Sequence, residues 1–386
     1  MKVRPFQIEI PDARLQDLRR RLGETRWPAG LDEAAWDDGA SLALMKRLVD
    51  YWRNDFDWRA QEARLNRLPQ YKATIDGLDI HFVHQPGVGP APLPLVLSHG
   101  WPGSFVEMEQ IIPLLSDPAA YGGDSADAFH VVAPSLPGYG FSDPPAEPGC
   151  SSRRIAELWS SLMRGLGHDR FGAQGGDIGA GVSMWLARLF PGEVIGAHVN
   201  YIPGSYRPAL GPDRPAITLE EQAFLDRSAA WASAEGAYAF MQGTKPLTLA
   251  YALMSAPAGL AAWIVEKFRS WSDCDGDVES VFSFDALLTD ISLYWFSDAL
   301  DASLRLYKEN RLQPLSFAPG ERVRPPLGVA LFPHELPLPP RSWLARAFDV
   351  QGWTPMPRGG HFAAMEQPAL LAEDIRAFFR PMRLRS

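Results

Sequence analysis

Two sets of apolar residues near the start of the chain recur at the spacing of an amphipathic helix: Leu15, Leu18 and Leu22, and then Leu44, Leu48, Trp52 and Phe56. Residues three or four apart share one face of a helix, so the pattern predicts two helices within residues 1–70. The first is expected to end at Trp27-Pro28, because proline does not continue a helix. Residues 71–84 instead alternate around Asp76-Gly77, which predicts a β-hairpin.

Short apolar runs follow a Pro/Gly-rich loop at residues 86–92, and helical segments separate them. The runs occupy residues 93–97, 128–133, 170–174 and 194–199, with a further one at residues 327–332. This alternation is typical of a parallel sheet built from βαβ units. An amphipathic helix at residues 370–379 is expected to close the chain. The predicted fold class is therefore α/β, with a doubly wound and mostly parallel sheet.

A helical insertion is predicted to interrupt this sheet. Residues 201 to about 215 are rich in Pro and Gly, Thr218 and Glu221 have the spacing of a capping box, and residues 284–310 form a long apolar helical stretch. The chain is expected to comprise an N-terminal extension of helices plus a hairpin (1–90), a first part of the α/β core (91–200), a helical cap (201–313) and a second part of the core (314–386).

Composition places the chain among soluble globular proteins. Of its 386 residues, 46% are hydrophobic and 22% are charged, which excludes disorder for most of the chain. There are 37 Lys and Arg residues against 46 Asp and Glu residues, giving a formal net charge of −9. Such a chain, without a long basic block, has no electrostatic footprint for nucleic acid. No nucleic-acid partner is expected.

Metal and cofactor motifs are also missing from the sequence. Cys150 and Cys274 lie far apart and form no CxxC pair, which argues against a cysteine zinc site and a disulfide framework. The eight histidines include no HExxH. His81 and His84 belong to a predicted strand, where their odd spacing points them to opposite faces. Neither a metal nor a cofactor is expected.

One uncharged stretch, residues 246–265, has nearly the length of a membrane span. It is rich in Ala, however, and carries Thr248, Ser255, Pro257 and Gly259. We interpret it as two short helices broken at residues 255–259 that line an apolar pocket. The first ten residues lack the apolar region of a signal peptide. A cytoplasmic protein with no membrane partner is therefore expected.

The sequence GGDIG at residues 175–179 follows a predicted strand and precedes a helix expected at residues 180–189. Glycines around a central polar residue are what a nucleophile elbow requires, because the tight turn pushes the central side chain out above the sheet. The central residue here is Asp177. The alternative is a Gly-rich turn in which Asp177 only caps the next helix. No G-x-G-x-x-G register is present, which argues against a dinucleotide-binding loop.

The sequence SHGWPG at residues 98–103 ends an earlier predicted strand. Enzymes with a nucleophile elbow place half of their oxyanion hole at this point. The backbone N–H groups of Trp101 and Ile178 are expected to converge on one oxygen. Gly100 and Pro102 would also shape a turn there, but a turn alone does not explain its position after the strand.

A general base is predicted at His361, within RGGHFAAMEQP at residues 358–368. It lies between the last predicted strand and the last helix, and it completes the chain order of nucleophile, acid and histidine. Glu335, just after the run at residues 327–332, is the expected acid that fixes the imidazole. Asp349, in the following segment, is a competitor that we rank below it.

An aspartate nucleophile changes the class of reaction. It can displace at an sp³ carbon and form an alkyl ester, which a water activated by His361 would hydrolyse with the oxyanion held by backbone amides. Epoxides and alkyl halides both suit this chemistry. Three functions stay open on the residues alone: an epoxide hydrolase, a hydrolytic dehalogenase, which needs N–H donors for the halide, and a ligand-binding protein that has lost turnover.

Taken together, HGWPGS, GGDIG and RGGHFAAMEQP, with QGTKP at residues 242–246 and GLAAWIVEKF at residues 259–268, resemble the microsomal-type epoxide hydrolases. The resemblance covers essentially the whole chain, including Pro5-Phe6 and Thr25-Arg-Trp-Pro28 of the extension. It implies an α/β-hydrolase fold with a helical cap, and an enzyme that converts an epoxide and water to a vicinal diol without a cofactor. The N-terminal anchor of the membrane-bound animal relatives is not visible, which favours a soluble enzyme.

The resemblance also assigns residue roles. It matches Asp177 as the nucleophile, Glu335 as the acid and His361 as the base, and it implies that Tyr238 and Tyr307 of the cap donate to the epoxide oxygen. Read from the residues alone, both tyrosines could instead be core aromatics. The competing tyrosines are Tyr251 and Tyr294.

The expected partners are a small apolar epoxide and water. Whether that epoxide is a xenobiotic, as in detoxification or aromatic hydrocarbon catabolism, or a biosynthetic intermediate stays open. The oligomeric state, a homodimer included, also stays open.

Overall fold

The computed structural model describes residues 1–30, 36–210 and 216–383. In these ranges nine strands form one sheet in the order β1-β2-β3-β5-β4-β6-β7-β8-β9. The strands are β1 (Val3–Pro5), β2 (Gln70–Ile75), β3 (Leu78–Gln85), β4 (Leu93–Ser98), β5 (Phe129–Pro134), β6 (Phe171–Gly175), β7 (Val194–Val199), β8 (Val323–Leu331) and β9 (Phe348–Pro355). Neighbouring strands from β5 to β9 run parallel, and the pairs from β1 to β5 run antiparallel. The predicted mostly parallel α/β sheet is confirmed.

Helices account for most of the remaining described residues. They are α1 (Asp12–Gly23), α2 (Leu42–Asn54), α3 (Trp58–Leu65), α4 (Ile111–Ser116), α5 (Ser152–Gly165), α6 (Asp177–Leu189), α7 (Leu219–Glu235), α8 (Ala237–Thr244), α9 (Pro246–Leu253), α10 (Pro257–Trp271), α11 (Phe284–Phe296), α12 (Leu300–Leu312), α13 (Arg341–Leu344), α14 (Ala363–Glu366) and α15 (Pro368–Arg383). Short 3₁₀ helices lie at Phe105–Met108, Pro118–Tyr121, Ser125–Asp127 and Val278–Ser280.

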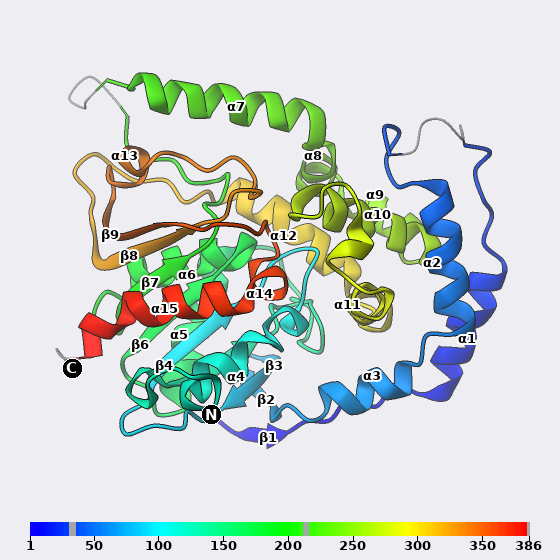
Figure 1. Cartoon of the computed structure of the whole chain (residues 1–386), viewed down its shortest axis with the longest axis horizontal. Coiled ribbons are helices and arrows are strands. Elements are labelled where there is room, and N and C mark those ends of the chain that lie inside the picture. The colour runs from blue at the N-terminus through cyan, green and yellow to red at the C-terminus, as the bar shows by residue number, and fades with distance from the viewer. Residues whose placement is uncertain (31–35, 211–215, 384–386) are drawn as a thin grey trace.

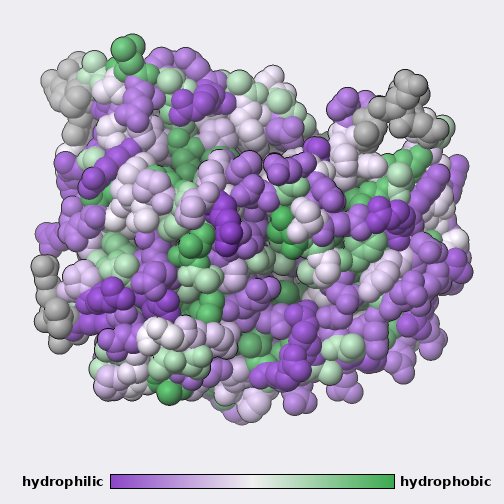
Figure 2. All heavy atoms as spheres, in the orientation of Figure 1, coloured by the Kyte–Doolittle hydropathy of each residue, from purple (hydrophilic) through white to green (hydrophobic). Residues whose placement is uncertain are grey.

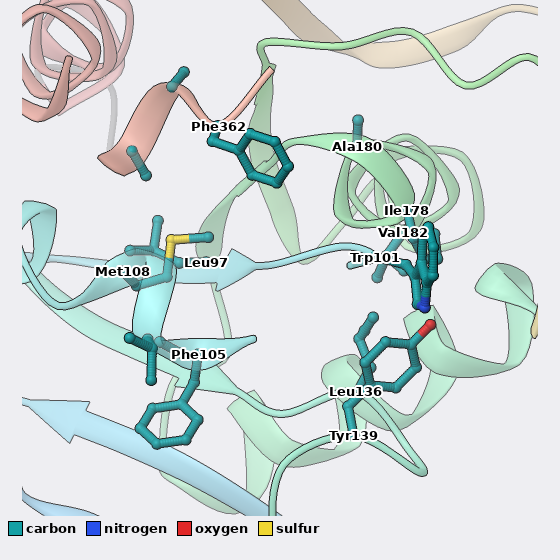
Figure 3. Close-up of a cluster of buried hydrophobic side chains, with 14 of the residues drawn as sticks. Leu97, Trp101, Phe105, Met108, Leu136, Tyr139, Ile178, Ala180, Val182 and Phe362 are labelled. Atoms are coloured by element: carbon teal, nitrogen blue, oxygen red, sulfur yellow. The ribbon is translucent and has the colours of Figure 1, made fainter. Parts of the chain in front are cut away.

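The central strands are buried on both faces, because helices cover each side of the sheet. Helices α5 and α6 pack on one face, and α4 and α15 pack on the other. Figure 1 shows α15 in front of the sheet and α6 behind it. Figure 3 shows part of the core, in which Leu97 of β4, Ile178 of α6 and Phe362 beside α14 are all buried. The chain segments that carry the candidate chemistry therefore rest on densely packed apolar side chains.

The N-terminal extension connects the sheet with the cap. The predicted hairpin around Asp76-Gly77 is present as β2 and β3, and it continues the central sheet because β3 pairs with β5. The helices α1 and α2 contact cap helices α10 and α11. There the Trp52 indole N–H donates to the hydroxyl of Ser292 at 3.1 Å, and Arg14 pairs with Asp298 at 2.6 Å. These contacts fix one side of the cap.

In the cap, the predicted start of one helix is present, whereas a stretch predicted as one long helix is interrupted. The capping box of Thr218 and Glu221 is present at the start of α7. The apolar stretch at residues 284–310 is not continuous, because it breaks between α11 and α12, where Asp298 has a φ of 54°. The last part of the predicted Pro/Gly-rich connection, residues 211–215, lies outside the described residues.

The uncharged stretch at residues 246–265 forms α9 and α10, as the sequence predicted, and a bend of 118° separates them. No single helix in the described ranges is long and apolar enough to cross a membrane, although this bent pair together has the length and composition to do so. Met254 and Leu260 line a cavity of about 260 Å³ against α1.

Figure 2 shows that the viewed face of the molecule is mostly hydrophilic, with hydrophobic residues in small separate patches.

Candidate active site

The turn between β6 and α6 has the geometry of a nucleophile elbow. Asp177 is the first residue of α6 and has a φ of 46°, a left-handed conformation that costs energy in a non-glycine residue. The turn fits against β4 so closely that a Cβ at Gly179 would lie 1.9 Å from the backbone oxygen of Ser98. The N-cap residue of α6 is Gly176, so no side chain caps the N-terminus of this helix. The alternative in which Asp177 only caps the helix is therefore not supported, because Asp177 is the first residue of α6 and not its N-cap.

The two carboxylate oxygens of Asp177 have different partners. Its Oδ1 accepts a hydrogen bond from the Trp101 backbone N–H at 2.8 Å. Its Oδ2 lies 3.5 Å from Nε2 of His361. Ile178 is the second residue of α6, where a backbone N–H has no acceptor within the helix. The structure thus places a backbone donor on Oδ1 and the histidine beside Oδ2.

The loop at residues 98–103 approaches Asp177 because residue 100 has no side chain. A Cβ at Gly100 would lie 2.3 Å from both Cβ and Oδ1 of Asp177. Trp101 follows Gly100 and is 1% exposed, so its amide is held in a water-poor setting where a hydrogen bond to a charged oxygen is strong.

His361 lies between Asp177 and a buried acid. Its Nδ1 lies 2.6 Å from Oε1 of Glu335, whose side chain is fully buried. Its backbone N–H donates to the Trp271 oxygen at 2.8 Å, and the Trp271 ring meets the imidazole edge-on. Glu335 follows β8 and His361 follows β9, so adjacent parallel strands deliver both side chains to one edge of the sheet.

The charge on His361 depends on its two acidic neighbours. Burial by itself lowers the pKa of the imidazole, but the carboxylates of Glu335 and Asp177 outweigh burial and raise the pKa well above its ordinary value. The two acidic neighbours therefore favour the protonated form of the imidazole. Removing the charge of Asp177 would lower the pKa of His361 again, because one of the two stabilising charges would be gone.

Asp349 does not reach the histidine. It is an exposed residue of β9, and its carboxylate accepts from the side chain of Gln351 at 2.8 Å. The carboxylate that lies against Nδ1 of His361 is that of Glu335, the acid that the sequence favoured.

Tyr238 and Tyr307 come together above Asp177. The two phenol rings meet edge-on at a centroid distance of 5.8 Å, and burial raises the pKa of both hydroxyls well above the ordinary value. Tyr238 stacks on Trp101 at a centroid distance of 5.5 Å, and Tyr307 meets the same indole edge-on at 5.8 Å. Because both phenols stay protonated, they can donate to an oxygen that gains negative charge.

The competing tyrosines occupy other places. Tyr251 is 72% exposed on α9. Tyr294 of α11 is buried, and its hydroxyl donates to the Gly103 oxygen at 2.6 Å. Neither lines the cavity that contains Asp177. Tyr294 instead supports the loop that carries Trp101.

A cavity of about 480 Å³ separates the cap from the elbow. Asp177 and Ile178 form its floor, Tyr238 and Tyr307 belong to its cap side, and Trp185 adds an aromatic wall. This volume lies in the range of small-molecule sites in enzymes. The helices α9 and α10, which the sequence reasoning assigned to an apolar pocket, contribute no residue to this cavity.

Glu366 is a residue that sequence reasoning did not single out. Its carboxylate accepts hydrogen bonds from the backbone N–H groups of Asp273, Gly360 and Phe362 at 2.8, 2.9 and 2.9 Å. Two of these residues flank His361, and Asp273 lies beyond the end of α10. Glu366 therefore fixes the histidine loop and ties it to the cap. Its place in the RGGHFAAMEQP motif was the available signal.

Tyr201 was missed as well. Its ring meets that of His361 edge-on at a centroid distance of 5.5 Å, and it lines the cavity above Asp177. Within residues 1–30, 36–210 and 216–383, no group of three or more His, Cys, Asp and Glu side chains could hold a metal ion.

Comparison with protein families gives two matches. Residues 3–108 match the family "Epoxide hydrolase N terminus", and residues 94–200 match the family "alpha/beta hydrolase fold". The first covers the extension and the loop with Trp101, and the second covers β4 to β7 with the elbow.

Individual proteins resemble the chain over nearly its full length. It is 46% identical to a protein of Stigmatella aurantiaca assigned to the epoxide hydrolases, over 99% of this chain and 86% of the relative. It is 38% identical to epoxide hydrolase 1 of Oryctolagus cuniculus, over 97% and 88%. The solved structure of the Aspergillus niger epoxide hydrolase matches with a TM-score of 0.85 and 31% identity, over 99% of this chain and 97% of that one.

Proposed function

The chain belongs to the microsomal-type epoxide hydrolases and is an epoxide hydrolase, and from that premise we propose that it opens its substrate through a covalent ester on Asp177. The dehalogenase and the ligand-binding protein that the residues alone left open give way to this function. The products of an epoxide and water are a vicinal diol, and the proposal concerns how this site forms them.

In the first step, Oδ2 of Asp177 attacks an epoxide carbon. The C–O bond of the ring breaks, and its electron pair stays on the oxygen, which takes a proton from the tyrosine pair. Tyr238 and Tyr307 support this role because they are protonated, buried and on the cap side of the cavity that Asp177 lines. Donors fixed in a water-poor site stabilise the developing charge without reorganising.

In the second step, water hydrolyses the ester. Alkylation removes the negative charge of Asp177, so the pKa of His361 falls and its neutral form can accept a proton from water. The resulting hydroxide forms a bond to Cγ of Asp177, and the oxyanion forms on Oδ1, where Trp101 donates. When this intermediate collapses, the ester C–O bond breaks and the diol oxygen takes the proton from His361. The proton left on the Asp177 carboxyl group returns to the deprotonated tyrosine, which restores the carboxylate and the tyrosine pair.

The observation that carries the proposal is the contact of Asp177 Oδ1 with the Trp101 amide at 2.8 Å. An oxyanion donor on the carboxylate is useful only if the carbonyl carbon of Asp177 is itself attacked. In the alternative mechanism, Asp177 or His361 activates a water molecule that attacks the epoxide directly. No oxyanion would then form on Asp177, and the Trp101 amide would stabilise no intermediate.

Isotope labelling in a single turnover tests the covalent route. With enzyme in excess over epoxide in ¹⁸O-enriched water, the diol should be largely unlabelled, because its new oxygen comes from Asp177. The label should appear in the peptide that contains Asp177, since water attacks its carbonyl carbon. Mass spectrometry of the diol and of the digested protein measures both. Labelled diol from the first turnover, with unlabelled enzyme, would show direct attack by water.

The two steps should also respond differently to pH. Ester hydrolysis requires neutral His361, whereas alkylation does not, so lowering the pH below the pKa of His361 in the ester should slow hydrolysis about tenfold per pH unit. The ester should therefore accumulate at low pH. Rapid-quench mass spectrometry of intact protein at a series of pH values measures it. Equal slowing of both steps would contradict the assigned role of His361.

We propose a small apolar epoxide as the substrate, because aromatic side chains such as Trp185, Tyr201 and Trp231 line the cavity. An aryl or alkyl epoxide of the kind formed during aromatic hydrocarbon catabolism or met in detoxification would fit this lining.

A cytoplasmic location is supported by Cys150 and Cys274, which are both free thiols, as expected in a reducing compartment.

A further inference from the structure

A second, much smaller cavity lies against Asp177. Its volume is about 10 Å³, which is the room that one water molecule needs. Of the described residues, Asp177 alone lines both this cavity and the large cavity under the cap. His361 lines the small cavity and is not among the residues that line the large one. The small cavity therefore adjoins both groups that ester hydrolysis requires.

The walls of this cavity carry polar groups that the two-step mechanism does not use. Glu107, from the 3₁₀ helix Phe105–Met108, contributes a carboxyl group, and Gln174 and Asn200 contribute amides from the ends of β6 and β7. The amide of Gln174 donates to that of Asn200 at 3.1 Å. A cavity with several polar partners holds water, whereas a purely apolar one stays dry.

Glu107 is held in place by its own loop. Its backbone N–H donates to the Ser104 oxygen at 3.1 Å, and its Oε1 occupies space that a Cβ at Gly103 would need. Next to it, the hydroxyl of Ser104 donates to Asp290 of cap helix α11 at 2.6 Å. Burial, together with the nearby charge of Asp290, raises the pKa of Glu107 well above its ordinary value. This shift favours the neutral form of Glu107, a carboxylic acid that can both donate and accept hydrogen bonds.

We propose that this cavity holds the water that hydrolyses the Asp177 ester, and that Glu107 is the positioning residue for that water. The inference rests on the proposed covalent mechanism. One O–H of the water points to Nε2 of His361, and the carbonyl oxygen of Glu107 accepts the other. A lone pair of the water oxygen then faces Cγ of Asp177.

Hydrolysis of the ester proceeds in two stages at this water. The water oxygen forms a bond to Cγ of Asp177 while one proton of the water passes to His361, and the ester C–O bond breaks when the intermediate collapses. The departing diol oxygen takes a proton from the imidazolium. Glu107 keeps its own proton throughout, so it acts by orienting the water. Because the substrate occupies the other cavity, it does not displace this water.

Two substitutions at Glu107 distinguish a role in orienting the water from a role in packing the side chains around the cavity. Glu107→Leu removes both hydrogen-bonding atoms and should slow ester hydrolysis at least tenfold while alkylation stays within about threefold of the wild type. Glu107→Gln retains a donor and an acceptor and should keep both rate constants within about threefold. Single-turnover rapid quench with mass spectrometry of intact protein measures the two steps separately.

A matched control lies two residues away. Glu109 pairs with Arg64 and does not line the cavity, so Glu109→Gln should leave both rate constants unchanged. If Glu107→Leu does not fold, Ala364→Val narrows the same cavity from another wall and should slow hydrolysis selectively.

The outcomes distinguish this inference from the mechanism on which it rests. If Glu107→Leu and Ala364→Val both hydrolyse the ester at the wild-type rate, the placement of the water is wrong and the covalent route stands. Equal slowing of alkylation and hydrolysis in these variants would also overturn it, because that pattern indicates a general disturbance. If no ester forms even in a His361→Gln enzyme, the covalent mechanism itself fails.

Discussion

Replacing His361 with glutamine is expected to stop turnover after the first chemical step. Asp177 keeps its Trp101 donor and the tyrosine pair across the cavity, so alkylation continues. Ester hydrolysis loses its general base, which should lower its rate by about a thousandfold or more. The ester should then accumulate to one equivalent per protein. Mass spectrometry of the intact enzyme after mixing with epoxide would show the added mass of the substrate.

Two carboxylate variants provide the comparison for this result. Glu335→Gln should give a milder form of the same defect, because Glu335 lies 2.6 Å from Nδ1 of His361 and stabilises the imidazolium. Asp349→Asn should behave as the wild type, since Asp349 is exposed and bonds to Gln351. A His361→Gln enzyme that binds the epoxide but never gains mass would contradict the two-step mechanism.

Loss of both cap hydroxyls should have the second largest effect, and it should fall on the first step. Tyr238→Phe and Tyr307→Phe should each slow alkylation about a hundredfold, since one donor aimed at developing charge contributes ~3 kcal/mol. The double variant should be nearly inactive on epoxides, because it removes both phenol hydroxyls that helices α8 and α12 bring to the cavity. Single-turnover alkylation rates measure the effect.

Tyr251 offers a matched control for the tyrosine pair. It is also a cap tyrosine, but it is 72% exposed and lies outside the cavity, so Tyr251→Phe should alkylate at the wild-type rate. A Tyr238→Phe/Tyr307→Phe enzyme that opens epoxides as fast as the wild type would show that the cap donors are other groups. Thermal unfolding of the variants checks that the cap remains folded.

Local sequence patterns predicted the parallel part of the sheet, the hairpin and the candidate triad, but not the short edge strand β1. An elbow is a strand, a tight turn and a helix within a few residues, so GGDIG was compatible with an Asp177 exposed above the sheet, and the motifs around Trp101 and His361 favoured that interpretation over a simple helix cap. His361 and Glu335 follow neighbouring parallel strands, and the ends of such strands meet at one edge. Short-range rules therefore placed all three side chains in the same region.

The choice among cap tyrosines was beyond those rules. Tyr238, Tyr251, Tyr294 and Tyr307 all lie in helices of the region predicted as the cap. The motif resemblance selected Tyr238 and Tyr307. The packing of α8 and α12 against Trp101 then shows that these two rings lie at the cavity of Asp177. Tyr294 instead donates to the loop at residues 98–103, through the Gly103 oxygen. Contacts between distant segments set those directions, and no helical periodicity encodes them.

Protonation states and the small cavity were decided by tertiary structure alone. In the sequence, Glu366 is an ordinary polar position of the RGGHFAAMEQP motif, and Glu107 lies three residues beyond the HGWPGS motif. Folding encloses Glu107 near Asp290, which raises its pKa, and surrounds Glu366 with three backbone donors. The sequence thus determined which chemical groups are available and along which strands they arrive. Burial and the distances between remote segments determined their charge, and those quantities exist only once the chain has folded.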